Sequence, residues 1–298
     1  MQTLTQIDTL AAALRAAQHP SGGWSYVAGQ PGRIEPTCWA LLAAGPQAKG
    51  QAVPHLQFLQ RSQQPSGLLV EDPAQPVNAA FNGLAAFTLL QPFWADASVW
   101  TGAARRVTAA LVLEKGVQLD QAPEYRQDNS LQGWSWVAGT FSWVEPTAWG
   151  LLALKTAGNG TPLDAEARAR IDEGDRLLLD RACDGGGWNY GNAEVFDQDL
   201  QPYVPTTALA LLALQDRRGT PIVDQGWAWL RAHAHEEPSG MALSLAIICA
   251  RVYGEPIPDL ETLLTAQWER SGFLGNVLVM AMALCALTPG GGAEAFRL

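Results

Sequence analysis

Two kinds of apolar pattern alternate along the chain from residue 4 onward. One kind places apolar residues on one face and charges on the other, as in DAEARARIDEGDRLLLD at 164–180. The other kind is apolar on nearly all sides, as in TAWGLLALK at 147–155. A helix with one apolar stripe lies at a surface, whereas a helix that is apolar all round must be covered on most sides. The alternation therefore predicts an outer and an inner layer of helices.

Twelve helices are predicted in this way, and the two kinds alternate strictly. The amphipathic helices are expected at 4–18, 48–64, 96–115, 163–182, 221–235 and 258–270. The apolar helices are expected at 36–44, 76–91, 146–158, 205–217, 238–254 and 274–288. No stretch alternates apolar and polar residues for long enough to indicate a sheet. The pattern predicts an all-α fold, a closed double ring of helices in one domain of residues 1–298.

The connection into an inner helix occurs twice in nearly the same form. The stretches GWSYVAGQPGRIEPTCW at 23–39 and GWSWVAGTFSWVEPTAW at 133–149 both place a glutamate, Glu35 or Glu145, before Pro-Thr. Proline favours the first helical turn and holds the preceding residue extended, so each glutamate is expected at or beside a helix start. Asp, Asn, Ser and Thr are the preferred caps. The related Val204-Pro205-Thr206 has valine before its Pro-Thr, which suggests that the turn does not need the acid.

The segment leading into the first of these stretches carries a spaced motif. Gln18 follows Leu14 by four residues, and Gly22 and Trp24 follow Gln18 by four and six. A partial copy runs from Phe58 through Gln63 to Leu69. This pattern resembles the QW repeat of squalene-hopene cyclases and related terpenoid cyclases. The Pro-Thr-x-Trp-Ala-Leu-Leu-Ala helix start is similar to those of the wider prenyltransferase and squalene-oxidase repeat superfamily. The resemblance implies an α6/α6 double-ring toroid in which Gln18, Gln63 and Trp24 tie outer to inner helices.

In such a toroid the inner helices run roughly parallel, so their starts gather at one mouth of the ring. Carbocation chemistry needs a strong acid or a carboxylate counter-charge in a pocket that excludes water, and aromatic faces stabilise positive charge. The candidate catalytic residues are Glu35, Glu145, Asp197 and Asp199. The candidate ligand-binding residues are Trp39, Phe81, Trp136, Phe141, Trp143, Trp149, Trp188 and Tyr190. Helix-dipole stabilisation of the acids and core packing of the aromatics are the competing interpretations.

Several motifs of these families are missing from the sequence. It contains neither Asp-x-Asp-Asp nor Asp-Asp-x-x-Asp, and its four histidines, at 19, 55, 233 and 235, all fall on predicted outer segments. We therefore expect no metal or other cofactor. The leading hypothesis is an isoprenoid-handling toroid, a noncanonical terpene cyclase or isomerase. The alternatives are a non-catalytic binder of a polyprenyl or other apolar ligand, and a scaffold whose acidic mouth binds a protein partner that covers it.

The net charge of the chain and the length of its apolar stretches limit the possible binding partners and the cellular compartment. A net charge of −10 argues against a nucleic-acid partner, which needs clustered Lys and Arg. The first residues lack the basic and apolar regions of a secretory signal, which predicts a cytoplasmic protein. The longest apolar stretch, 273–287, is shorter than the roughly 20 residues of a spanning helix, which leaves peripheral membrane contact open. The four cysteines show no metal-ligand spacing and are expected to be buried thiols.

Overall fold

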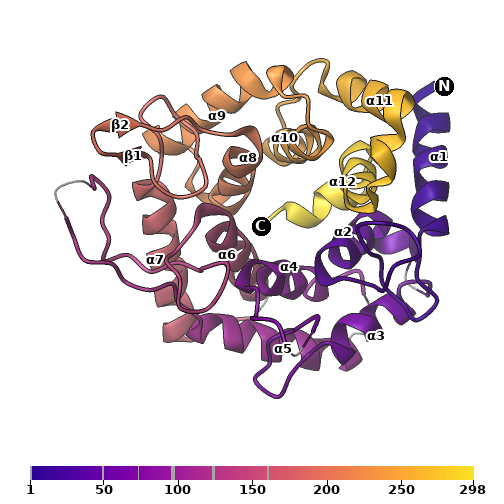
Figure 1. Ribbon diagram of the computed structural model, residues 1–298, viewed down its shortest axis with the longest axis horizontal. Helices are drawn as coiled ribbons and strands as arrows, with labels where there is room; N and C mark the ends of the chain where they lie inside the picture. Colours follow the sequence, from indigo (N-terminus) through magenta and orange to yellow (C-terminus); the bar gives the residue numbers. More distant parts are fainter. Residues whose placement is uncertain (1, 49, 73, 95–97, 123–124, 160) are drawn as a thin grey trace.

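Two concentric rings of helices form the protein (Figure 1). The computed structural model describes residues 2–48, 50–72, 74–94, 98–122, 125–159 and 161–298. The outer helices are α1 (Gln2–Ala16), α3 (Val53–Arg61), α5 (Ser98–Leu113), α7 (Ala165–Asp180), α9 (Pro221–His233) and α11 (Leu260–Ser271). The inner helices are α2 (Ile34–Ala44), α4 (Ala79–Leu89), α6 (Val144–Gly158), α8 (Val204–Ala213), α10 (Gly240–Tyr253) and α12 (Val277–Leu287). The predicted α6/α6 double ring is confirmed; position 49 of the helix predicted at 48–64 and positions 96 and 97 of the helix predicted at 96–115 lie outside the described residues.

The inner ring is closed by contacts between helices that are neighbours in the circle. Each inner helix packs against the next, and α12 packs against α2. Small residues permit close approach: a Cβ at Gly83 of α4 would come within 2.8 Å of the Trp149 Cβ on α6. The inner helices are apolar all round because the ring covers one side and the outer helices cover the other. This arrangement puts the main hydrophobic core between the two rings.

Tryptophan side chains tie three outer helices to the inner helices that follow them. Each indole N–H donates to a backbone carbonyl in the last turn of an outer helix, where carbonyls lack an intrahelical partner. The donor and acceptor pairs are Trp24 and Leu14 (2.8 Å), Trp134 and Leu111 (2.9 Å), and Trp188 and Leu178 (2.6 Å). Trp188 is completely buried in such a tie. Its prediction as a ligand-binding residue is therefore corrected to a role in helix packing.

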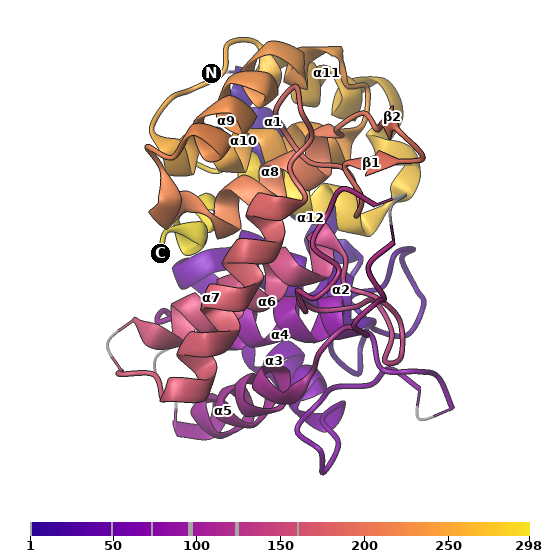
Figure 2. The same cartoon turned by 90° about the vertical axis from the view of Figure 1, so that its left-hand side faces the viewer.

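A short segment after α12 fills the ring from the side opposite the long connections (Figures 1 and 2). It forms a 3₁₀ helix, η5 (Gly292–Phe296), and the Phe296 side chain is completely buried. The Phe296 ring centroid lies 5.7 Å from that of Trp39, 5.0 Å from Phe87 and 6.2 Å from Trp149. Aromatic side chains thus close one end of the ring axis.

The long connections on the mouth side contain a small hairpin that the sequence pattern did not predict (Figure 2). Strands β1 (Glu194–Val195) and β2 (Gln198–Asp199) pair antiparallel, and Phe196 and Asp197 form the turn with φ of 52° and 57°. Two-residue strands are too short to show an alternating pattern, which is why the pattern missed them. Within the described ranges, no helix is both long and apolar enough to cross a membrane.

Candidate active site at the mouth of the inner ring

Three inner helices begin in the same hydrogen-bonded register. The residue before each helix donates its backbone N–H to the backbone carbonyl of a tryptophan. The backbone N–H of the same tryptophan donates to the hydroxyl of the fourth residue of the helix. The sets are Arg33, Trp24 and Thr37 for α2; Trp143, Trp134 and Thr147 for α6; and Tyr203, Trp188 and Thr207 for α8. The two glutamates therefore occupy the second helical residue of α2 and α6.

This register corrects the sequence comparison with α8 by one position. Val204 is the first residue of its helix and corresponds to Ile34 and Val144, so the residue equivalent to the glutamates is Pro205. The repeated Pro-Thr misled the comparison, because in α8 the second threonine of a pair, Thr207, bonds the tryptophan. The conclusion that the turn forms without an acid still holds, since proline occupies that position in α8.

Neither glutamate caps its own helix through its side chain. The helices α2 and α6 have Arg33 and Trp143 as N-caps, with no side-chain capping bond in either case. The first N–H of α6 is bonded by the Tyr190 carbonyl (2.9 Å). The first N–H of α2 donates to the carboxylate of Glu71 (2.6 Å), which also pairs with Arg33 (2.6 Å). Helix capping therefore does not account for Glu35 or Glu145.

Glu35 is held by a neighbouring tyrosine. The Tyr26 hydroxyl donates to a carboxylate oxygen of Glu35 at 2.6 Å. Burial raises the pKa of Glu35, the hydrogen bond from Tyr26 opposes this, and the nearby charge of Glu71 raises it further. Burial, together with the charge of Glu35, also raises the pKa of Tyr26 well above its ordinary value. At neutral pH Tyr26 therefore acts as a hydrogen-bond donor and fixes the position of the Glu35 carboxylate.

Glu145 has a carboxyl group poised to exchange a proton near neutral pH. Burial raises its pKa to about 7, the charge of Glu35 adds to this, and the indole of Trp149 donates toward the carboxylate and opposes it. The side chain keeps part of its surface accessible to solvent. The helix α4, with the small residue Ala80 at the equivalent position, lies between α2 and α6 in the ring, and the charge of Glu35 still acts on Glu145 across it.

An aromatic floor lies one helical turn below the two glutamates. Trp39 and Trp149 follow Glu35 and Glu145 by four residues, a spacing that places side chains on the same helix face. Their ring centroids are 5.7 Å apart in an edge-on arrangement, and both rings contact Phe296. Both tryptophans are nearly fully buried. The sequence pointed to the two tryptophans but not to Phe296, because that residue follows the last helix and belongs to no repeat.

Two recesses open at the mouth beside this centre. The first has a volume of about 490 Å³, and its lining includes Phe141, Trp143, Tyr190, Tyr203, Asn189, Asn192 and Asp199. The second has a volume of about 470 Å³, and its lining includes Arg33, Ile34, Glu71, Phe81 and Val137. Trp136 contacts Phe81 edge-on, with centroids 6.4 Å apart. Of the predicted aromatic residues, Phe141, Trp143 and Tyr190 line the first recess and Phe81 lines the second, whereas Trp136 and Trp188 line neither.

Two aromatic pairs line the first recess. Phe141 and Trp143 stack with centroids 4.5 Å apart, and Tyr190 and Tyr203 lie 5.0 Å apart. Asp199, on strand β2, borders this recess, while Asp197 lies in the hairpin turn; both are exposed. The structure does not place these two aspartates in the buried environment that Glu35 and Glu145 share.

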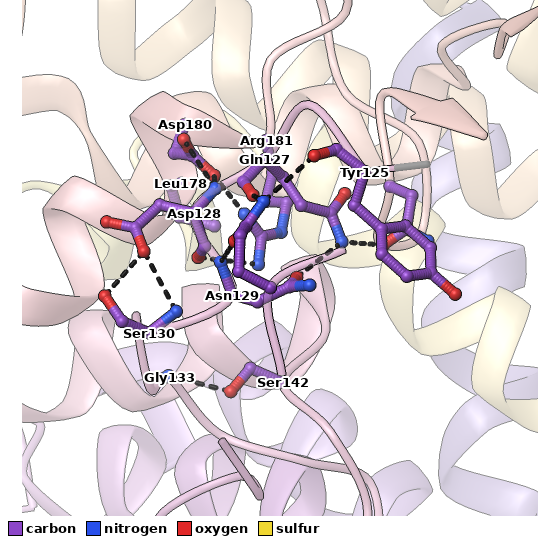
Figure 3. Close-up of polar contacts among 12 residues, drawn as sticks. Tyr125, Gln127, Asp128, Asn129, Ser130, Gly133, Ser142, Leu178, Asp180 and Arg181 are labelled. Carbon is purple, nitrogen blue, oxygen red and sulfur yellow. Dashed lines mark hydrogen bonds and ion pairs between the residues drawn. The ribbon is translucent and has the colours of Figure 1, made fainter. Parts of the chain in front are cut away.

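A polar network fixes the connection that forms one side of the first recess (Figure 3). The Gln127 amide nitrogen donates to the side-chain oxygens of Asn129 (3.1 Å) and Asn192 (2.8 Å). The Asn129 amide nitrogen in turn donates to the Asp120 carbonyl (3.0 Å), and the Arg181 guanidinium donates to the Asp128 carbonyl (3.4 Å). The network links this connection to the one that carries Tyr190. Sequence reasoning missed it because its members are ordinary loop residues.

Within the described ranges, no group of three or more His, Cys, Asp or Glu side chains is arranged to hold a metal ion. The four cysteines are buried as free thiols. What the site offers is two carboxyl groups, one tyrosine hydroxyl and several aromatic faces. Such a set can donate, accept and hold a proton, and it can stabilise positive charge.

Comparison with known proteins identifies the fold class. The sequence matches no protein-family model and none of the curated proteins. A type II terpene cyclase, MstE from Scytonema, solved with its substrate geranylgeranyl dihydroxybenzoate, superposes with a TM-score of 0.58 at 14% identity, covering 99% of this chain and 98% of that one. The chain has the α/α-toroid fold.

Other toroids with different activities match about as well. The GH76 α-mannanase BT2949 from Bacteroides thetaiotaomicron has a TM-score of 0.58 at 12% identity, covering 95% of this chain and 82% of that one. The cellobiose 2-epimerase from Spirochaeta thermophila has a TM-score of 0.56 at 12% identity, covering 89% and 85%. Because one fold supports unrelated chemistries, the activity has to be argued from the site.

Proposed function

We propose that the protein is an isoprenoid-handling enzyme of the isomerase or cyclase type that moves a proton at the Glu35–Glu145 pair. The observation that carries this proposal is the occurrence of both glutamates at the same position of two inner helices, with raised pKa values, above a floor of tryptophans. Carboxyl groups whose pKa values are perturbed by burial and by a neighbouring charge are typical of acid–base sites. No capping role competes for either side chain.

The raised pKa values specify the kind of proton transfer. A carboxyl group with a pKa of about 7 is a weaker acid than an ordinary glutamic acid, so it suits general acid–base catalysis at neutral pH. Protonation of an isolated alkene would need a stronger acid. The site therefore favours a substrate whose reacting group is activated, such as an epoxide or an alkene conjugated with a carbonyl. An ionised Glu35, held by Tyr26, would serve as counter-charge to a developing cation.

The aromatic walls of the mouth support an apolar, isoprenoid-type substrate. The terpene cyclase MstE, which shares the fold, binds a geranylgeranyl compound. In this chain Phe296, Trp39 and Trp149 close the lower part of the ring, so the substrate would lie in the recess that Phe141 and Tyr190 line, with its reacting end over the carboxyl pair. A chain threaded along the ring axis would have to displace Phe296.

The test is incubation of the protein in D₂O with linear isoprenoids of about ten to thirty carbons that carry a terminal epoxide or an alkene conjugated with a carbonyl, followed by mass spectrometry. Product formation or deuterium incorporation by the wild-type protein is expected. Glu145→Gln should abolish it, and Glu35→Gln should reduce it, while circular dichroism shows an unchanged fold. The control is Glu166→Gln, because Glu166 is exposed on α7. Product formation that survives Glu145→Gln would contradict the proposal.

Non-catalytic binding of an apolar ligand is the second candidate, and one observation favours it. The mouth recesses are open rather than sealed from water, with the ring centre below them filled by side chains. A binder would retain an isoprenoid through the aromatic walls without converting it. Ligand recovery from the wild-type protein and from Glu145→Gln in equal amounts, with no product from either, would favour this candidate over the enzyme.

A further inference from the structure

A third recess lies far from the glutamates, at the other end of α2. Its volume is about 460 Å³, and it opens between the outer helices α1 and α3 onto the inner helices α2 and α12. The C-terminal ends of the inner helices border it, with Ala44 and Gly45 from α2 and its cap and with Leu284 from α12. Glu35 lies at the N-terminal end of α2. We call this recess the α1–α3 crevice.

One buried histidine faces the α1–α3 crevice. His55, the third residue of α3, is only 5% exposed and lines the crevice. The backbone N–H of Gly23 donates to its Nδ1 at 2.8 Å, and its ring lies against Trp24 with centroids 4.0 Å apart. Its other nitrogen, Nε2, has no hydrogen-bond partner among the described residues. Nε2 is not fully enclosed by protein, so a ligand atom can reach it.

The bond from Gly23 fixes the tautomer of His55. A ring nitrogen that accepts an N–H carries no proton, so the proton of the neutral imidazole is on Nε2. Burial lowers the pKa of His55 to about 4, which keeps the ring neutral at physiological pH. His55 therefore presents a single N–H donor to the crevice and no positive charge. A ligand group that meets it must be a hydrogen-bond acceptor.

The rest of the crevice wall is mainly apolar. Its apolar side chains include Ile7, Ala11, Leu14, Leu41 and Leu284. The polar side chains of α1 that border it, Asp8, Arg15 and Gln18, are exposed and lie toward solvent. Small-molecule sites have this composition, with apolar walls and a few polar groups that fix orientation, and volumes of about 300–1,000 Å³.

We infer that the α1–α3 crevice binds a small apolar molecule through a carbonyl oxygen that accepts the Nε2–H of His55. Three features support it: an apolar recess of suitable volume, an accessible N–H donor without a protein partner on a histidine that is otherwise buried, and a tautomer fixed by the backbone. The crevice shares no lining residue with the two mouth recesses. Its occupancy does not depend on the chemistry at Glu145.

The probes are carvone and limonene, two ten-carbon molecules with the same ring skeleton, of which only carvone has a carbonyl. Isothermal titration calorimetry should show that carvone binds the wild-type protein roughly three- to tenfold more tightly than limonene, the ratio expected for one hydrogen bond. In spectra of protein labelled with ¹⁵N-histidine, the Nε2–H signal of His55 should be present before titration and should move on addition of carvone. Equal affinities for the two probes would indicate water at Nε2 and would overturn the inference.

A pair of neighbouring alanines on α1 supplies matched variants that leave His55 in place. Ala11 lines the crevice, whereas Ala12 is exposed and does not. Ala11→Phe should fill the crevice and abolish carvone binding, while Ala12→Phe should bind as the wild type does. Carvone binding that persists in Ala11→Phe, or that fails in the wild-type protein, would refute the site. Thermal unfolding of both variants checks that the fold is retained.

Discussion

Replacement of Glu145 by glutamine should change how the stability of the protein depends on pH. The pKa of this carboxyl rises from an ordinary 4.5 in the unfolded chain to about 7 in the folded protein. Between these values the folded state binds more protons than the unfolded state, so the free energy of unfolding falls as pH rises. At 1.36 kcal/mol per pH unit, the loss attributable to Glu145 amounts to about 3 kcal/mol. Glutamine, which does not ionise, escapes this loss.

The assay is urea denaturation of the wild-type protein and Glu145→Gln at about pH 4.5 and about pH 8. Relative to the wild-type protein, the free energy of unfolding of Glu145→Gln should be about 3 kcal/mol higher at pH 8 than at pH 4.5. Groups that do not interact with Glu145 titrate alike in both proteins and cancel in this difference. The exposed-site variant Glu166→Gln should show no such shift. If the free energies of unfolding of Glu145→Gln and wild type change with pH in parallel, the folded protein does not raise the pKa of Glu145. The argument for Glu145 as the proton carrier then fails.

Three further changes test the roles that the structure gives to side chains. Phe296→Ala should lower the free energy of unfolding by about 3–5 kcal/mol through the cavity it leaves, whereas Phe196→Ala, on the exposed hairpin turn, should have little effect; chemical denaturation compares them. Trp188→Phe removes the donor to the Leu178 carbonyl and should cost about 1–3 kcal/mol by the same measurement, without weakening ligand binding at the mouth. Asp199→Asn should change stability by no more than about 0.5 kcal/mol and leave product formation intact, and a loss of product would reinstate Asp199 as a catalytic candidate.

The double ring could be predicted from the sequence because the apolar pattern of each helix indicates how many of its sides must be buried. Helices such as α6, with Leu151 and Leu152 on different sides and both fully buried, are viable only between two layers. The β1–β2 hairpin and η5 were not readable, because short segments have no period. The position of Phe296 depends on contacts with Trp39 and Phe87 that are distant in sequence.

The candidate site was readable in part. The repeated Glu-Pro-Thr singled out Glu35 and Glu145, and the structure places both in the same helix register and in one electrostatic environment. The sequence could not show that Tyr26 would hold Glu35, since their contact depends on the path of the connection. It also favoured a strong acid, whereas burial makes these groups weaker acids.

Ring closure between α2 and α12 has a consequence for synthesis of the chain on the ribosome. The inner helix at residues 34–44 is made long before its partner at residues 277–287 and before Phe296, which closes the ring axis. Contacts between such distant segments slow folding, because a long loop must be ordered before they form. Until then the apolar sides of α2 stay uncovered, so the nascent protein should depend on chaperones that shield apolar helices.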